Sequence, residues 1–114
     1  MFTYKAVLKR IVDGDTIDVV IDLGFDIHYN TRVRLSGINT PECRTRDLEE
    51  KKRGLAAKAR LEELLEGDDL TIKTQLDKSG KFGRVLGEIF MKNVSINDRL
   101  VEEGHATPYF GGKR

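Results

Sequence analysis

Three successive segments in the first third of the chain have the sequence pattern of β-strands, and they constrain the fold more than any other feature. They are Tyr4–Val12, which is rich in strand-forming residues, and Thr16–Leu23 and His28–Leu35, in which apolar and polar residues alternate. An alternation with a period of two residues predicts a strand with one buried face. The links between the segments are short, and the first contains Asp13-Gly14, which is typical of a hairpin turn. The sequence therefore predicts a three-stranded antiparallel meander.

The next segment predicts a helix. Between about Gly54 and Glu66, apolar residues recur on one helical face, and a glycine typical of a helix end follows. A capping box formed by Asp47 and Glu50 would start this helix earlier, but Gly54 disfavours a helix that passes through it. We therefore expect the highly charged segment 44–53 to be an exposed loop or a frayed helix start.

Two more strands and a second helix follow. The strands are predicted at Leu70–Leu76 and Val85–Met91, on either side of a turn-rich connector. Ser95 and Asp98 predict a capping box at the start of a short helix, and Gly104 is placed to end it.

The predicted order of elements is β-β-β-α-β-β-α. Five short strands with a helix between the third and the fourth is the plan of an OB-type barrel. We therefore expect an α+β, mainly β fold, in which a five-stranded OB-fold barrel carries two helices. Residues 1–114 are long enough for one domain. Residues 105–114 show no periodicity, and we expect this tail to be mobile.

Composition limits the classes of protein that fit the chain. With 39% apolar residues, 34% charged residues and a net charge of +1, the chain has the composition of a soluble globular protein. No apolar run approaches the length of a membrane span, so we expect no membrane partner. The small net charge gives no argument for or against a nucleic-acid partner, which must be argued from the position of particular charges.

The single cysteine, Cys43, excludes an internal disulfide and fits a reducing compartment. A buried or loop thiol is the favoured interpretation of Cys43, rather than a metal ligand. No export signal is visible, so we expect a cytoplasmic protein, although a mature secreted domain would look the same. In the absence of a heptad pattern or an obvious apolar patch, we expect a monomer.

Three short stretches carry chemically useful groups. The first, Val12–Thr16, places the carboxylate of Asp15 at a strand start. The second, Arg34–Glu42, combines a guanidinium, a kinked segment with oxygen donors and a carboxylate. The third, Lys81–Arg84, is a turn with two cationic side chains. These are the groups needed to hold a phosphate, a hard cation and an attacking water.

Each stretch alone has an ordinary explanation, because hairpin turns and solvated surface charges are common. An EF-hand loop that starts at Asp13 is excluded by its spacing. Its fifth and twelfth positions would be Ile17 and Gly24, which offer no side-chain oxygen.

Together, in this order and at these spacings, the stretches resemble the staphylococcal nuclease family of thermonuclease-like domains. The resemblance extends from about Tyr4 to Tyr109. Its most specific motifs are D-G-D-T at Asp13–Thr16, R-L-x-G-I-x-T-P-E at Arg34–Glu42 and K-[YF]-G-R at Lys81–Arg84. The resemblance implies a small OB-fold barrel with a calcium-dependent site that hydrolyses phosphodiester bonds of DNA, RNA or both, with little sequence specificity.

The resemblance also implies a cation site and a base. Asp15, Asn39 and the main-chain oxygen of Thr40 would bind Ca²⁺, or Mg²⁺ or another divalent ion in its place. Glu42 would activate the attacking water. A hard cation held by oxygens and a carboxylate beside a water are chemically suited to these tasks.

The remaining implied residues would contact the nucleic acid. Arg34 and Arg84 would bind the reacting phosphate, and Lys81 would contact a neighbouring phosphate. Two guanidinium groups offer paired donors to the charge that builds on phosphate oxygens during attack. Phe82 keeps a ring that can stack on a base, although the family has a tyrosine there. Tyr109 lies near the family's substrate-contacting tyrosines, although packing of the tail explains it equally well.

Asn39 is the main departure from the family, which has an acidic residue at this position. An amide oxygen still ligates calcium, but the site lacks one negative charge. Our hypothesis is that the cation binds weakly to the free protein and more tightly once a substrate phosphate supplies charge.

The alternative is a catalytically silent member of the same fold that only binds nucleic acid or protein. A silent copy is expected to lose its catalytic side chains first, whereas Arg34, Glu42 and Arg84 are all present. The change at Asn39 is the one point in favour of the silent copy. A plain OB-fold single-strand binder is expected to have more exposed aromatic residues than the eight aromatics of this chain allow.

Overall fold

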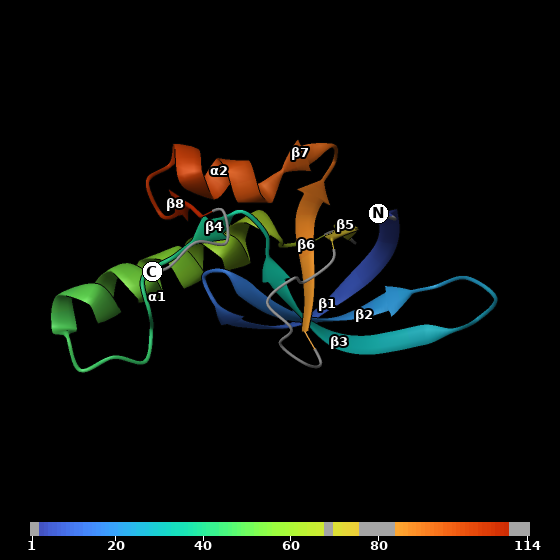
Figure 1. Cartoon of the computed structure of the whole chain (residues 1–114), viewed down its shortest axis with the longest axis horizontal. Helices are drawn as coiled ribbons and strands as arrows, with labels where there is room; N and C mark the ends of the chain where they lie inside the picture. The colour runs from blue at the N-terminus through green and yellow to red at the C-terminus, as the bar shows by residue number, and fades with distance from the viewer. Residues whose placement is uncertain (1–2, 68–69, 76–83, 110–114) are drawn as a thin grey trace.

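A parallel pairing between two distant strands closes the sheet of this protein into a barrel (Figure 1). The computed structural model describes residues 3–67, 70–75 and 84–109. The barrel strands are β1 (Thr3–Asp13), β2 (Thr16–Asp22), β3 (His28–Leu35), β5 (Leu70–Gln75) and β6 (Arg84–Met91). β1, β2 and β3 form the predicted antiparallel meander, and β5 pairs with both β1 and β6. Because β6 also pairs with β3, the predicted five-stranded OB-type barrel is confirmed.

Alternate residues of the strands fill the barrel. Ile17, Val19 and Ile21 of β2 and Val33 and Leu35 of β3 are at most 2% exposed, as their alternation predicts. Each such aliphatic side chain contributes about 1.5–3 kcal/mol when it leaves water. These residues fix which face of each strand is inside.

The outer half of the β2–β3 hairpin extends beyond the barrel (Figure 1). Tyr29, which the alternation places on the same face as Val33 and Leu35, is 46% exposed for this reason. The period of two residues predicts the face of a strand but not how far the opposite wall of the barrel extends.

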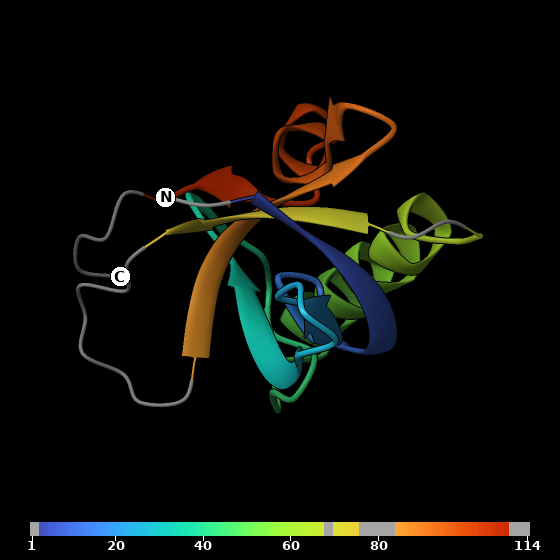
Figure 2. The same cartoon turned by 90° about the vertical axis from the view of Figure 1, so that its right-hand side faces the viewer.

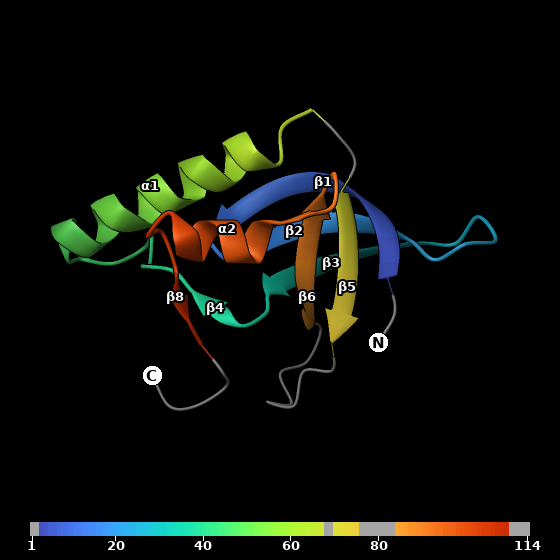
Figure 3. The same ribbon diagram turned by 90° about the horizontal axis from the view of Figure 1, so that it is seen from above.

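Two helices, α1 (Leu48–Leu64) and α2 (Ile96–Glu102), lie side by side on one side of the barrel (Figures 2 and 3). α1 packs on β1 and α2 packs on β6. The capping serine of α2 is confirmed, because Ser95 Oγ accepts a hydrogen bond from the Asp98 N–H at 3.3 Å. Neither helix in the described part of the chain has the length and apolar character needed to cross a membrane.

α1 begins well before Gly54. Asp47 is its N-cap, and the carboxylate of Asp47 accepts hydrogen bonds from the N–H groups of Glu49 and Glu50 at 3.0 and 3.3 Å. Most of the segment 44–53 that was expected to be a loop or a frayed start is therefore regular helix. Gly54 lies buried inside the helix because it contacts another part of the backbone, as described below.

Residues 105–109, which were expected to belong to a mobile tail, are part of the fold. The short strand β8 (Thr107–Pro108) pairs with β4 (Ile38–Asn39), and the Tyr109 N–H donates to the Gly37 carbonyl at 2.8 Å. A further short strand, β7 (Val94–Ser95), pairs with β6. The β4–β8 pairing holds Asn39 in place next to the end of β3.

Candidate active site

Five of the nine predicted site residues meet at one rim of the barrel. The β1–β2 turn, the end of β3, β4 and the loop before α1 surround a polar cavity of about 250 Å³. It is lined by Asp13, Asp15, Thr16, Arg34, Asn39, Thr40, Pro41, Glu42, Cys43 and Arg44.

Asp15 is the buried acidic group of this cavity. One carboxylate oxygen, Oδ2, lies 3.4 Å from Arg34 Nη1 and accepts the Thr40 N–H at 3.2 Å. The other, Oδ1, accepts the hydroxyl of Thr16 at 3.1 Å. The Asp15 and Arg34 side chains are only 12% and 14% exposed, so solvent screens this ion pair little. Asp15 therefore joins the β1–β2 turn to the Thr40 segment, 25 residues further along the chain.

Arg34 is the buried cationic group of the cavity. Besides its contact with Asp15, its Nη1 donates to the Leu35 carbonyl at 3.0 Å, and its Nη2 donates to Asn39 Oδ1 at 3.4 Å. The guanidinium therefore connects two of the three residues expected at a cation. The planar fork of a guanidinium also suits a phosphate oxygen.

Arg32 precedes Arg34 by two residues on the same face of β3 but belongs to a different cluster. Its Nε and Nη2 donate to the carboxylate of Asp18 at 2.9 and 3.3 Å, outside the cavity. These hydrogen bonds are the main reason that the pKa of Asp18 is lowered. Arg32 is exposed and already paired, so it serves as a natural comparison for Arg34.

Glu42 lies exposed at the mouth of the cavity, where a carboxylate can reach a water. Its backbone is held by α1, because its N–H donates to Glu50 Oε2 at 3.1 Å. A Cβ atom at Gly54 would lie 2.5 Å from the Glu42 carbonyl oxygen and 2.8 Å from that of Pro41. Only glycine allows helix and loop to approach this closely.

The contribution of Glu50 and Gly54 was not predicted from the sequence. The sequence assigned Glu50 to a capping box and treated Gly54 as an obstacle to the helix. The only available signal was the glycine itself, because an isolated glycine inside a helical pattern often marks a close packing contact.

The oxygens around the cavity fit a hard divalent cation. Asp15 supplies a carboxylate and Asn39 an amide oxygen. Besides the main-chain oxygen expected at the cation, Thr40 has a buried hydroxyl with no hydrogen-bond partner in the described part of the chain. Oxygen ligands of this kind suit Ca²⁺ or Mg²⁺ rather than a thiophilic metal. Among residues 3–67, 70–75 and 84–109, no group of three or more His, Cys, Asp and Glu side chains is arranged to hold a metal. Any cation here would therefore be held by at most two such side chains, together with amide, hydroxyl or main-chain oxygens.

Cys43 lines the cavity, but its surroundings disfavour the reactive thiolate form. It is 7% exposed, as expected of a buried thiol. Burial raises the pKa of its thiol, and the neighbouring Asp13 carboxylate raises the pKa further. A thiol that stays protonated at neutral pH is a poor nucleophile and a poor metal ligand.

The remaining predicted site residues are placed only in part. Lys81 and Phe82 lie outside the described residues, as does the side chain of Arg84. The backbone of Arg84 begins β6 in register with Arg32 on β3. Tyr109 is half-buried, holds the end of β8 to Gly37 and does not line the cavity.

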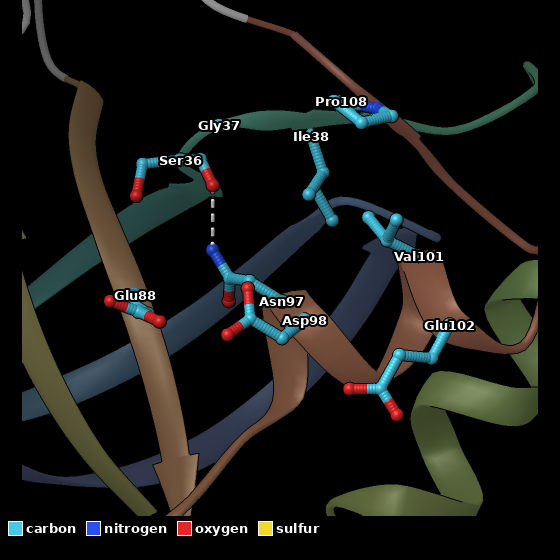
Figure 4. Close-up of a pocket in the computed structure, with 9 residues that line it drawn as sticks. All are labelled: Ser36, Gly37, Ile38, Glu88, Asn97, Asp98, Val101, Glu102 and Pro108. Atoms are coloured by element: carbon cyan, nitrogen blue, oxygen red, sulfur yellow. Dashed lines mark hydrogen bonds between the residues drawn. The ribbon is translucent and has the colours of Figure 1, made fainter.

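A second, larger hollow of about 580 Å³ lies between α2, β6 and the end of β3 (Figure 4). Its rim carries the carboxylates of Glu88, Asp98 and Glu102, which would repel a phosphate. The buried amide of Asn97 donates to the Ser36 carbonyl at 2.8 Å, which is the dashed contact in Figure 4. This hollow therefore has the wrong charge for a nucleic-acid backbone.

An OB-type barrel with an arginine, a buried aspartate and an exposed glutamate around one polar cavity defines a class of protein that can engage a phosphate group. The chain belongs to the staphylococcal nuclease family. The family model described as staphylococcal nuclease homologue matches residues 32–114, which include β3, the Arg34–Glu42 segment and everything after it. The resemblance stated from the motifs is confirmed.

Individual relatives agree with this assignment. The chain is 30% identical to endonuclease YhcR of Bacillus subtilis over 94% of its own length, and 31% identical to the thermonuclease of Staphylococcus intermedius over 90%. It is also 30% identical to endonuclease YncB of Bacillus subtilis over 87% of its length. The chain spans only 9%, 58% and 45% of these three relatives, respectively.

Proposed function

We propose that this chain is a metal-dependent nuclease that hydrolyses phosphodiester bonds of DNA, RNA or both with little sequence specificity. The observation that carries the proposal is the network in which Arg34 contacts Asp15 and Asn39 beside the exposed carboxylate of Glu42. Membership of a nuclease family and relatives named endonuclease and thermonuclease support it.

In this proposal Glu42 accepts a proton from the attacking water. Its carboxylate is exposed, while its backbone is held against α1, so the base is accessible and its attachment point is fixed. Arg34, and Arg84 from the neighbouring strand β6, donate hydrogen bonds to the phosphate oxygens on which negative charge builds. As the family resemblance implies, Lys81 contacts a neighbouring phosphate, Phe82 stacks on a base and Tyr109 contacts the substrate.

Asp15, Asn39 and Thr40 are the proposed ligands of a calcium or magnesium ion. A bound divalent ion supplies Lewis-acid polarisation of the phosphate and orients the water. Arg34 already contacts the Asp15 and Asn39 oxygens that would serve as ligands. The same two oxygens would therefore have to be shared between the guanidinium and the ion.

The proposed cation site makes a direct prediction for Asn39. Asn39→Asp adds one negative charge beside Asp15, so calcium should bind about tenfold more tightly, or about 1.4 kcal/mol. Titration calorimetry on the free protein measures this change. The control is Asn30→Asp, which adds the same charge at an exposed position on β3 outside the cavity. Equal calcium affinity of wild type and Asn39→Asp would show that residue 39 is not a ligand.

The second candidate is a catalytically silent module that binds nucleic acid or protein, and the amide at Asn39 is the observation that favours it. A silent module needs the basic groups but not the base. The two candidates therefore differ in whether binding is followed by cutting.

Incubation with single- and double-stranded DNA and RNA tests the two candidates. With calcium or magnesium present, the nuclease proposal expects cleavage of at least one substrate, and it expects a chelator to abolish that cleavage. Product lengths on a gel report the activity, and gel shift reports binding in the same samples. Binding without metal-dependent cutting would establish the silent module instead.

A further inference from the structure

We propose that Glu50 is a positioning residue. It holds the loop between β4 and α1, which carries Glu42, through the main chain of Glu42. The inference rests on the proposed function, since it concerns the residue proposed as the base. Its basis is the hydrogen bond from the Glu42 N–H to Glu50 Oε2, 3.1 Å long, between residues eight positions apart.

The start of α1 is arranged so that the Glu50 side chain is available for this contact. In a standard capping box, the residue at the third helical position accepts the N–H of the N-cap residue. Here Asp47 caps the helix, but its own N–H donates to Thr45 Oγ1 at 3.2 Å. Glu50, at the third helical position, reaches Glu42 instead. Glu50 therefore does not complete the capping box with Asp47 and contacts the loop at Glu42 instead.

Gly54 supports the same stretch of loop one helical turn further on. The Glu42 carbonyl lies so close to Gly54 that an added Cβ would be only 2.5 Å from its oxygen. The loop is thus held at the Glu42 N–H by Glu50 and at the Glu42 carbonyl by packing against Gly54. Fixing both peptide groups of one residue fixes the direction of its Cα–Cβ bond. In this way α1 determines the direction in which the Glu42 side chain leaves the main chain.

Glu49 provides a matched control for the effect of charge on the helix. Glu49 and Glu50 both lie in the first turn of α1, where negative charge is favourable next to the helix dipole. Glu49 is exposed and does not line the cavity, whereas Glu50 contacts Glu42. Alanine at either position removes the same charge from the helix, but only Glu50→Ala removes the contact with the loop.

The first experiment measures the contact without any enzyme assay. Amide hydrogen exchange of Glu42, followed by NMR, should be about fivefold faster in Glu50→Ala, which corresponds to the loss of one ordinary hydrogen bond. In Glu50→Gln the amide oxygen can still accept the Glu42 N–H, so exchange should stay close to wild type. Glu49→Ala should also leave it unchanged. Equal Glu42 exchange in wild type and Glu50→Ala would overturn the proposal.

The second experiment measures the consequence for cleavage. Glu50→Ala should lower kcat about tenfold or more with little change in KM, because a displaced base affects the reacting geometry more than binding. Glu50→Gln should restore most of the rate, and Glu49→Ala should match wild type. A rate for Glu50→Ala equal to that of Glu49→Ala would overturn the positioning role while the nuclease proposal stands. Faster Glu42 exchange in Glu50→Ala, combined with no cleavage by wild type, would support the contact and overturn the nuclease proposal.

Discussion

Replacing Glu42 by glutamine should lower the rate of phosphodiester cleavage about 100-fold or more at neutral pH. Glutamine keeps the size of the side chain but cannot accept the proton of the attacking water. The Glu42 backbone contact with Glu50 involves the main chain, so the loop should keep its position. Single-turnover cleavage of a short labelled oligonucleotide measures the chemical step directly.

Two comparisons make the Glu42 result specific. Glu49→Gln removes an equivalent exposed carboxylate seven residues later and should cleave at the wild-type rate. Thermal unfolding of Glu42→Gln should match wild type, because the Glu42 side chain is exposed. Retention of wild-type cleavage by Glu42→Gln would remove Glu42 from the chemistry, even if the chain proves to be a nuclease.

Replacing Arg34 by alanine should lower cleavage by about 10²–10³-fold, the usual effect of losing one donor to a transition-state oxyanion. The same change should also destabilise the fold by about 1–3 kcal/mol, because the buried Asp15 carboxylate would lose its only described ion pair. Cleavage must therefore be measured well below the midpoint of thermal unfolding. Arg34→Lys keeps the charge but loses the planar fork, so it should recover stability more than rate.

Arg32→Ala is the matched control for Arg34→Ala. Arg32 lies on the same face of the same strand, but its partner is Asp18 and its side chain is 47% exposed. An exposed ion pair contributes about 0–1 kcal/mol, so stability should change little and cleavage should stay within about threefold of wild type. Similar losses of cleavage in the two variants would show that general positive charge, rather than the cavity, explains the effect of Arg34.

The sequence was informative wherever local periodicity controls the structure. Alternation in β2 and β3 predicted the inward positions of Ile17, Val19, Val33 and Leu35, because a strand that borders a core must bury every second residue. The N-cap at Ser95 was predicted because capping involves residues only a few positions apart.

The sequence was less informative where distant segments decide the structure. On propensity alone, Gly54 argued against a helix that begins before it and passes through it, at a cost of about 1 kcal/mol relative to alanine. Close packing against Pro41 and Glu42 reverses that argument, because no other residue fits the contact. The β4–β8 pairing was missed because two-residue strands carry no measurable periodicity.

The order of amino acids specifies which chemical groups are present: a guanidinium at Arg34, a carboxylate at Glu42 and the kinked segment between them. How these groups meet depends on the folded chain. Alternation places Arg32 and Arg34 on one face of β3, yet Arg34 alone joins Asp15 in the cavity. That difference arises because β3 ends at the rim where the β1–β2 turn and the Thr40 segment converge. Periodicity specifies the face of a strand, whereas the convergence of chain segments far apart in sequence depends on closure of the whole barrel.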